Sequence, residues 1–263
     1  MHSSAVRATS TSWAVEIDMV TKIGEVEALF RYPVKSMSGE ALEAAELGWH
    51  GVDGDRRLAL RRIDDRSGFP WLTASKLPEL ILFAPVRRAA DGLPTHVRTP
   101  EGEELALFSQ QLAAEIGRRH RSPVEMTHLN RGIFDEASLS VISSATIGGI
   151  SKLAGHRPDV RRFRPNILVQ SLRSDPFEED AWVRGVLSFG EGDAAAIIGV
   201  TNRDERCSMI NFDPDSARQN PEVLQAVVRE RDNKAGVYGT VLRRGRLAVG
   251  QPIFFEPAAP QLG

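Results

Sequence analysis

The sequence predicts a mainly β protein with a β-barrel architecture and a few short helices. Strand-like runs outnumber helical ones, turn-forming residues recur between them, and no regular alternation of strand and helix is present. The chain has 263 residues, of which 41% are hydrophobic, and a formal net charge of -2. This composition is that of an ordinary soluble globular protein, and the length suffices for one large domain or two modest ones.

The first half of the chain is predicted to be mostly β. In its first strand, apolar positions alternate with polar ones at Val26, Ala28, Phe30 and Tyr32. A period of two residues is the signature of a strand that is buried on one face. The alternation returns at Leu58 and Leu60, and residues 99–102 predict a turn between strands at 96–98 and 105–107.

Three short helices are predicted from their capping residues. Ser109, Ser144 and Asn220 each precede apolar residues at helical spacing, and Pro221 is the residue favoured at the first helical position. The apolar positions are Leu112 and Ile116 in the first helix, Ile147, Ile150 and Leu153 in the second, and Leu224, Val227 and Val228 in the third.

Further strands are predicted at residues 167–169, 182–189, 194–200, 238–242 and 247–249. The last two are joined by residues 243–246, which have the composition of a turn, so we expect them to form a hairpin.

The expected organisation is two domains with a tail at each end. We expect a disordered tail over residues 1–21, an N-terminal domain over 22–130, a second domain over 131–257 and a short tail over 258–263. The first 20 residues lack the continuous apolar core of a secretory signal. No run approaches the roughly 18–20 apolar residues that cross a bilayer, so no membrane association is expected.

Charge and cysteine content argue against several functional classes. With 33 basic and 35 acidic residues, the chain lacks the basic excess of a dedicated nucleic-acid binder. Cys207 is the only cysteine, so no intramolecular disulfide can form and a reducing, cytoplasmic location is expected. Zinc-ligand spacings and the P-loop and α/β-hydrolase motifs are also missing from the sequence.

Two patterns that resemble functional motifs are better explained as turns. Residues 190–195 match the glycine pattern of dinucleotide-binding loops, but no long amphipathic helix follows, so we predict a hairpin turn. The carboxylate pairs Asp53/Asp55 and Asp213/Asp215 lie in segments that contain Gly or Pro, where Asp favours local hydrogen bonds.

Cys207 is the strongest single candidate for chemistry. A lone cysteine is most often a small buried apolar residue. Here it ends the charged segment 203–207, in which arginines would favour the thiolate and Glu205 would oppose it. The thiolate is the form that attacks electrophiles or binds soft metals.

Basic and polar residues at the ends of predicted strands form a second group of candidates. Lys35 and Ser36 follow the first strand, Arg56 precedes the next, and Arg164 with Asn166 leads into a third. Ammonium and guanidinium groups suit a phosphate, and an amide both donates and accepts. Each such residue, taken alone, is more often an ordinary polar group at a strand end.

Taken together and in order, these residues belong to a larger set of motifs. The set comprises Tyr32-Pro-Val-Lys-Ser36, Gly54-Asp-Arg56, Leu72-Thr-Ala74, Phe163-Arg-Pro-Asn166, Glu179-Asp-Ala-Trp182, Arg206-Cys207, Asp213-Pro-Asp215 and Tyr238-Gly239. It resembles the MOSC family, named for the molybdenum cofactor sulfurase C-terminal domain, with its N-terminal β-barrel extension. The resemblance covers about residues 22–256 and is nearest to the branch that contains the mitochondrial amidoxime-reducing component.

The resemblance implies a β-barrel-rich fold in two parts that together bind a molybdenum cofactor of the molybdopterin type. It makes Cys207 the catalytic residue and the protein ligand of molybdenum. The cofactor-binding residues that it implies besides Cys207 are Lys35, Ser36 and Arg56 at the phosphate, Arg164 and Asn166 at the pterin, Ser138, and Arg206 beside the cysteine. The chemistry of these side chains agrees, since a soft thiolate suits molybdenum and cationic side chains suit a phosphate.

The implied function is an oxidoreductase that reduces N-hydroxylated or N-oxide substrates by oxygen-atom transfer. A chain with one cysteine cannot hold an iron–sulfur cluster through the usual four thiolates. We therefore expect a separate electron-transfer protein as a partner, in addition to the small-molecule substrate.

Two alternatives to a reductase stay open. The first is a carrier of molybdenum cofactor, or of sulfur as a persulfide on Cys207, without turnover of small molecules. The second keeps the fold and uses the pocket for another anionic ligand without metal. The sequence also departs from the family pattern, because Glu205 stands where close relatives have a small residue, and Ser75 and Ala137 replace an arginine and a hydroxyl residue.

Overall fold

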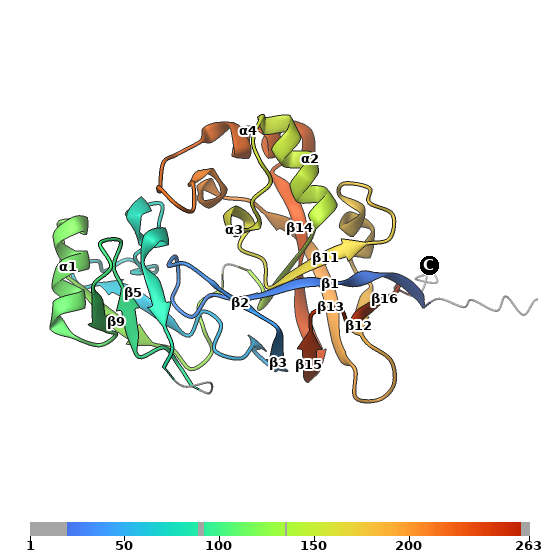
Figure 1. Cartoon of the computed structure of the whole chain (residues 1–263), viewed down its shortest axis with the longest axis horizontal. Helices are drawn as coiled ribbons and strands as arrows, with labels where there is room; N and C mark the ends of the chain where they lie inside the picture. Colours follow the sequence, from blue (N-terminus) through green and yellow to red (C-terminus); the bar gives the residue numbers. More distant parts are fainter. Residues whose placement is uncertain (1–19, 89–91, 135, 259–263) are drawn as a thin grey trace, which may run out of the picture.

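A computed structural model describes residues 20–88, 92–134 and 136–258. Apart from residues 20, 21 and 258, the two predicted tails lie outside the described residues. Figure 1 shows two parts, a strand-rich part covered by helices α2 and α4 and a smaller part around α1, β5 and β9.

Within the described residues, seven strands close into a barrel and an eighth extends its sheet. The order around the barrel is β1 (Thr21–Arg31), β11 (Ile167–Ser171), β10 (Leu139–Ser143), β14 (Lys234–Arg243), β13 (Ala196–Glu205), β12 (Val186–Phe189) and β16 (Pro252–Glu256). The barrel closes because β1 pairs with both β11 and β16, and β2 (Glu40–Leu42) pairs with the far end of β1. The predicted mainly β fold with a barrel is confirmed.

Three small sheets complete the β structure of the described chain. They contain β15 (Gly245–Ala248), β3 (Ala44–Gly48) and β4 (Gly51–Val52); β5 (Leu58–Arg62) and β9 (Val124–His128); and β6 (Ala84–Val86), β7 (His96–Arg98) and β8 (Glu104–Ala106). The last two sheets belong to the smaller part of the molecule (Figure 1).

The helices are short. They are α1 (Gln110–His120), α2 (Ser144–Ala154), α3 (Val160–Phe163) and α4 (Pro221–Arg231), with 3₁₀ turns η1 (Pro78–Leu82), η2 (Glu178–Trp182) and η3 (Ser208–Asn211). As predicted, Ser109 caps α1, because its hydroxyl accepts the N–H of Leu112 at 3.1 Å. The prediction for α2 was wrong by one residue, since Ser143 is the capping residue and its hydroxyl accepts the N–H of Thr146.

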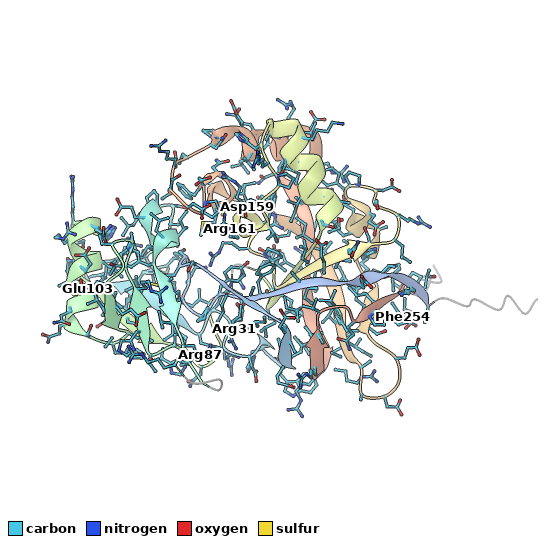
Figure 2. The ribbon with its side chains drawn as sticks, viewed as in Figure 1. Arg31, Arg87, Glu103, Asp159, Arg161 and Phe254 are labelled. Atoms are coloured by element: carbon cyan, nitrogen blue, oxygen red, sulfur yellow. The ribbon has the colours of Figure 1, made fainter. Side chains whose placement is uncertain are left out.

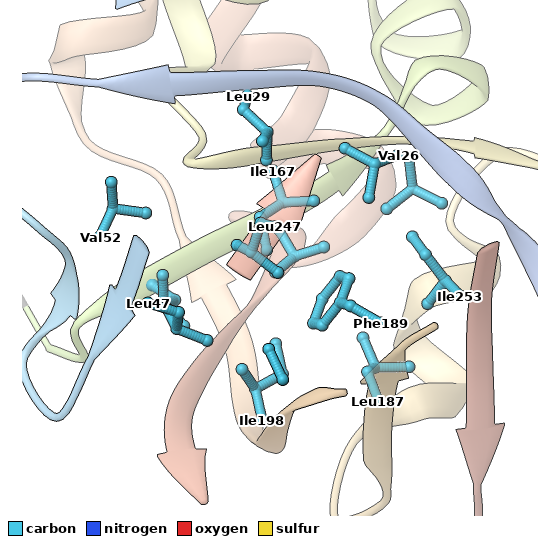
Figure 3. Close-up of a cluster of buried hydrophobic side chains, with 14 of the residues drawn as sticks. Val26, Leu29, Leu47, Val52, Ile167, Leu187, Phe189, Ile198, Leu247 and Ile253 are labelled. Carbon is cyan, nitrogen blue, oxygen red and sulfur yellow. The ribbon is translucent and has the colours of Figure 1, made fainter. Parts of the chain in front are cut away.

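Alternation along the barrel strands builds two apolar layers. Val141 and Ile167 point into the barrel and pack in the core shown in Figure 3, which also contains Phe189 and Ile253. Ile142, next to Val141 in β10, points outward and packs against α2 and α4. Both faces of β10 are therefore covered, which explains why all five of its residues are buried.

The smaller part has a core of its own, around Leu60, Phe83 and Leu112. The chain alternates between the two cores, since β1 and β3 pack in the barrel core whereas Val34, between them in sequence, packs in the smaller one. The predicted domain boundary at residue 130 stays a prediction.

Several predicted elements need correction. Residues 247–249 do not form a hairpin with 238–242, because β15 pairs with β3. The predicted strand at 182–189 is reduced to β12, since residues 178–182 form η2. Leu153 is 46% exposed, although helical spacing placed it with the buried Ile147 and Ile150.

The turn interpretations are confirmed for residues 190–195 and for Asp213, but not for Asp55, which is buried and accepts the N–H of Tyr32, 23 residues away in sequence. Residues 190–195 join the antiparallel strands β12 and β13, so this glycine pattern forms a hairpin connection. Asp213 accepts the backbone N–H groups of Asp215 and Ser216 at 3.2 and 3.0 Å, as expected of an aspartate in a turn.

Candidate functional site

A cavity of about 320 Å³ lies at the junction of the two parts of the molecule. Its volume is in the range of small-molecule binding sites. The lining residues come from both parts of the molecule: Lys35, Ser36, Arg56, Thr73, Ala74, Ser75, Ala137, Ser140, Arg162, Phe163, Arg164, Asn166, Asp204, Glu205, Arg206, Cys207, Met209, Ile210 and Tyr238.

The loop after β1 is fixed by backbone hydrogen bonds. Tyr32 donates its N–H to Oδ1 of the buried Asp55 at 2.7 Å and accepts the N–H of Arg56 at 2.8 Å. Lys35 donates its N–H to the carbonyl of Leu58 at 2.8 Å. The side chains of Lys35 and Ser36 are thereby held in the cavity wall, where both residues are buried.

Three of the predicted cofactor-binding residues have left-handed backbone conformations. The φ angles are 67° at Ser36, 50° at Arg56 and 52° at Arg164. This region is uncommon for residues other than glycine, and residues held in it are concentrated at functional sites.

Two arginines stack on one buried tyrosine. The guanidinium carbons of Arg56 and Arg164 lie 5.0 and 4.2 Å from the ring centroid of Tyr32. Burial raises the pKa of Tyr32 well above its usual value, although both arginines oppose this, so the phenol is neutral at pH 7. Arg56 also pairs with Asp55, and Arg164 donates to the carbonyl of Met37 at 2.7 Å.

Asn166 joins elements from both parts of the molecule. It is fully buried, and its Oδ1 accepts the N–H of Ser140 at 3.2 Å and Nη1 of Arg56 at 3.4 Å. Its Nδ2 donates to the carbonyl of Phe30 at 3.3 Å. One amide therefore ties β1, β10 and the Arg56 turn together beside the cavity.

A buried ion pair lies behind the cysteine. Asp204 and Arg206 are 2% and 6% exposed, and their side chains form an ion pair of 2.9 Å. Asp204 also accepts the hydroxyl of Ser140 at 2.7 Å, and Arg206 donates to the carbonyls of Phe163 and Ala235. Burial raises the pKa of Asp204, and the charge of Arg206 opposes this shift.

Cys207 lies at the exposed rim of the cavity. It follows the last residue of β13 by two positions and precedes η3. Exposure alternates over this segment: Asp204 and Arg206 are buried, whereas Glu205 and Cys207 are exposed and line the cavity. The alternation therefore places a carboxylate and the thiol on the same side of the chain.

The structure brings together all but one of the predicted site residues. Ser138 is not among the cavity-lining residues, and Ser140, two positions later, lines the cavity instead. Sequence reasoning missed Ser140, Asp204, Tyr238 and Arg162. The spacing of Asp204 and Arg206 was the available signal, because residues i and i+2 of a strand share a face.

The structure describes no helix long and apolar enough to cross a membrane in residues 20–88, 92–134 and 136–258. In the same ranges, no group of three or more His, Cys, Asp and Glu side chains is arranged to hold a metal ion.

Comparisons with known proteins agree with this architecture. The sequence model of the MOSC domain matches residues 117–254, and that of the MOSC N-terminal beta barrel domain matches residues 23–139. Mitochondrial amidoxime-reducing component 1 from Danio rerio is 28% identical over 129 residues, which cover 46% of this chain and 37% of that protein. The chain therefore matches little more than a third of the length of this curated relative.

One solved structure shares the fold over nearly the whole chain. The YuaD protein from Bacillus subtilis superimposes with a TM-score of 0.50 and 13% identity, covering 91% of this chain and 98% of that one. YiiM from Geobacillus stearothermophilus has a TM-score of 0.36 and 20% identity, and the match covers 48% of this chain and 56% of that one.

The family match and the curated relative support a function connected with the molybdenum cofactor. Since the MOSC domain model covers more than half of the sequence, and its N-terminal barrel model most of the rest, the chain belongs to the MOSC family.

Proposed function

We propose that this chain is a molybdenum-cofactor-dependent oxidoreductase that reduces N-hydroxylated or N-oxide substrates. The observation that carries the proposal is the cavity itself, in which an exposed thiol and buried cationic side chains line one space. The curated relative, whose name refers to amidoxime reduction, indicates the class of substrate.

The side chains around the cavity fit a molybdopterin-type cofactor. An anionic phosphate needs cationic and hydroxyl partners, and Lys35, Ser36 and Arg56 offer them on a fixed backbone. A pterin edge needs both donors and acceptors, which Arg164 and Asn166 supply. The thiol of Cys207 supplies the soft ligand that molybdenum prefers.

The cofactor, when bound, would supply the two-electron oxygen-atom transfer, and the protein would supply binding and orientation. Cys207 would ligate the molybdenum. The buried Asp204–Arg206 pair would hold the segment before Cys207 in place, since Arg206 is fixed by two carbonyls as well as by Asp204. Reducing electrons would come from a separate protein in the cytoplasm.

The test is to measure molybdenum and pterin per chain in protein from a host that makes the cofactor. We expect near-stoichiometric amounts in the wild type and a large loss of molybdenum in Cys207→Ser. The control Ser208→Ala changes the neighbouring side chain and keeps the thiol, so it should retain its molybdenum. A Cys207→Ala protein with full molybdenum-dependent reductase activity would contradict the proposal.

The exposure of Cys207 also favours a second candidate function, that of a cofactor or sulfur carrier. A thiol at the rim is accessible to a partner protein, as a persulfide carrier requires. Mass spectrometry of the isolated protein separates the two functions. A carrier of sulfur should show an increment of about one sulfur atom on Cys207 that thiols remove, whereas a reductase needs none.

A further inference from the structure

Glu205 is exposed beside Cys207 in the wall of the cavity. Because residues i and i+2 of an extended chain share a face, its carboxylate lies on the same side of the segment as the thiol. The deeper residues of the cavity, such as Lys35 and Arg206, are buried and cationic. Asp204 and Glu205 are the two acidic residues among those that line the cavity; Asp204 is buried and paired with Arg206, so Glu205 is the one exposed at the rim.

The nearby cations on the same sheet have other partners. Lys234, which lies opposite Glu205 in the register of β13 and β14, pairs with Asp232 at 2.7 Å. Arg203 lies 3.6 Å from Asp180, and Arg206 points to the buried side and pairs with Asp204.

Glu205 forms no ion pair with any other described residue. Its hydrogen-bond partner is neutral, since Nδ2 of Asn233 donates to Oε1 at 3.4 Å. The carboxylate therefore presents an uncompensated negative charge at the mouth of the cavity. It also lines an adjoining groove of about 620 Å³, which gives a substrate room to extend past it.

We propose that Glu205 is a specificity-determining residue that selects N-hydroxylated amidines and guanidines. This inference rests on the proposed reductase function. An amidoxime takes up two electrons from the electron-transfer protein and three protons from solvent. The N–O bond breaks, the oxygen leaves as water, and the organic product is an amidinium cation.

The charge of the product distinguishes this class from other N-oxygenated compounds. A hydroxamic acid takes up two electrons and two protons and gives water and a neutral amide. Only the first reaction creates a positive charge in the pocket, and the carboxylate of Glu205 would stabilise that charge as it forms. For charges a few ångströms apart near the protein surface, the preference should be about tenfold.

The experiment compares wild type with Glu205→Gln, which keeps the shape and removes the charge. Glu27→Gln is the control, because Glu27 is exposed on β1 and does not line the cavity. The ratio of kcat/KM for benzamidoxime to that for benzhydroxamic acid should fall about tenfold in Glu205→Gln. The ratio should be unchanged in Glu27→Gln, and Glu205→Asp should retain part of the preference.

Ligand binding gives a second readout that does not depend on turnover. Calorimetry of the isolated protein should show that benzamidine, a cation, binds about tenfold more weakly to Glu205→Gln, whereas the neutral benzamide binds equally to both. Selective loss of benzamidine binding in a protein without reductase activity would support the role of Glu205 and remove the proposed function. An active reductase whose kinetic ratio and benzamidine affinity are unchanged by Glu205→Gln would overturn the inference.

Discussion

The barrel and the smaller part of the molecule contribute to the site in different ways. The barrel supplies Ser140, Asp204 and Tyr238 from its strands, where alternation decides which side chains face the cavity and which face the barrel interior. The smaller part and its connections supply Ser36 and Arg56 from loops with left-handed backbone. Strand register therefore determines which barrel residues reach the cavity. The loop residues reach it through individual backbone conformations that the surrounding packing must hold in place.

The largest expected effect is a loss of stability on truncating a core phenylalanine, and it tests whether the two cores unfold independently or together. Phe189 in the barrel and Phe83 in the smaller part are both fully buried, so Phe189→Ala and Phe83→Ala should each cost about 3–5 kcal/mol. Because the site residues of the two parts are joined by hydrogen bonds, we expect each variant to unfold in one transition at a lower denaturant concentration. Urea unfolding followed by circular dichroism checks this, and two separated transitions would contradict it.

The next effect concerns the amide that joins the two sides. Asn166→Ala should destabilise the protein by about 3 kcal/mol, because it leaves the buried N–H of Ser140 and carbonyl of Phe30 without their side-chain partner. The free energy of unfolding from urea titration is the measurement. Asn130→Ala is a suitable control, because Asn130 is exposed and should change stability by less than about 0.5 kcal/mol.

Acids in the two regions should respond to pH in opposite directions. Burial raises the pKa of Glu179, which accepts hydrogen bonds from Ser143 and Thr146 near the barrel. The folded protein then binds more protons than the unfolded chain at pH values above the usual 4.5, so stability falls as pH rises through that range. Glu179→Gln should remove this loss.

Glu40, at the junction, behaves in the opposite way. Burial raises its pKa, but hydrogen bonds from Arg31 and Arg87 outweigh this and hold it below 4.5. Figure 2 shows these two arginines near each other between the two parts. The contribution of Glu40 to stability should therefore be lost as pH falls below 4.5, and Glu40→Gln should lack that loss. Urea titrations between pH 3 and pH 8 measure how the free energy of unfolding changes with pH for both carboxyls, and each slope should be at most about 1.4 kcal/mol per pH unit. Slopes of the same sign would refute the opposite roles of Glu179 and Glu40.

The smallest effect tests the strained loop side. Ser36→Gly relieves the cost of a left-handed φ of 67°, whereas Ser36→Ala keeps it, so the glycine variant should be more stable by about 1 kcal/mol. Both remove the hydroxyl, so both should bind less pterin if Ser36 holds the phosphate. Thermal unfolding and pterin content are the two measurements. Equal stability of the variants would show that the backbone at Ser36 is not strained.

The sequence predicted the barrel strands better than their partners. Alternating residues identified β1, and a strand-like run identified the second half of β14, but β2 and β3 are short and rich in Ala and Glu, which have low strand propensity. Without β3 as a recognised strand, β15 had no visible partner except β14, and the incorrect hairpin followed.

The sequence predicted those site residues that belong to a recognised sequence motif. It missed those that only the folding of the chain brings to the cavity. Ser138 and Ser140 are two residues apart, so strand alternation would place both on the same face and cannot choose between them. The strand β10 begins only at Leu139. The left-handed conformations of Arg56 and Arg164 have no sequence signal, because such conformations are usually signalled by glycine.

The pairing of β1 with β16 has a consequence for the order of folding. Thr21 lies opposite Phe255, so the contact that closes the barrel joins residues near the two ends of the described chain. The sheet β6–β7–β8 instead pairs neighbours in sequence and requires only short loops to close. Contacts between residues far apart in sequence form slowly. The smaller part can therefore assemble during synthesis, before β1 pairs with β16. The cavity, which needs both parts, is then complete only in the final step of folding.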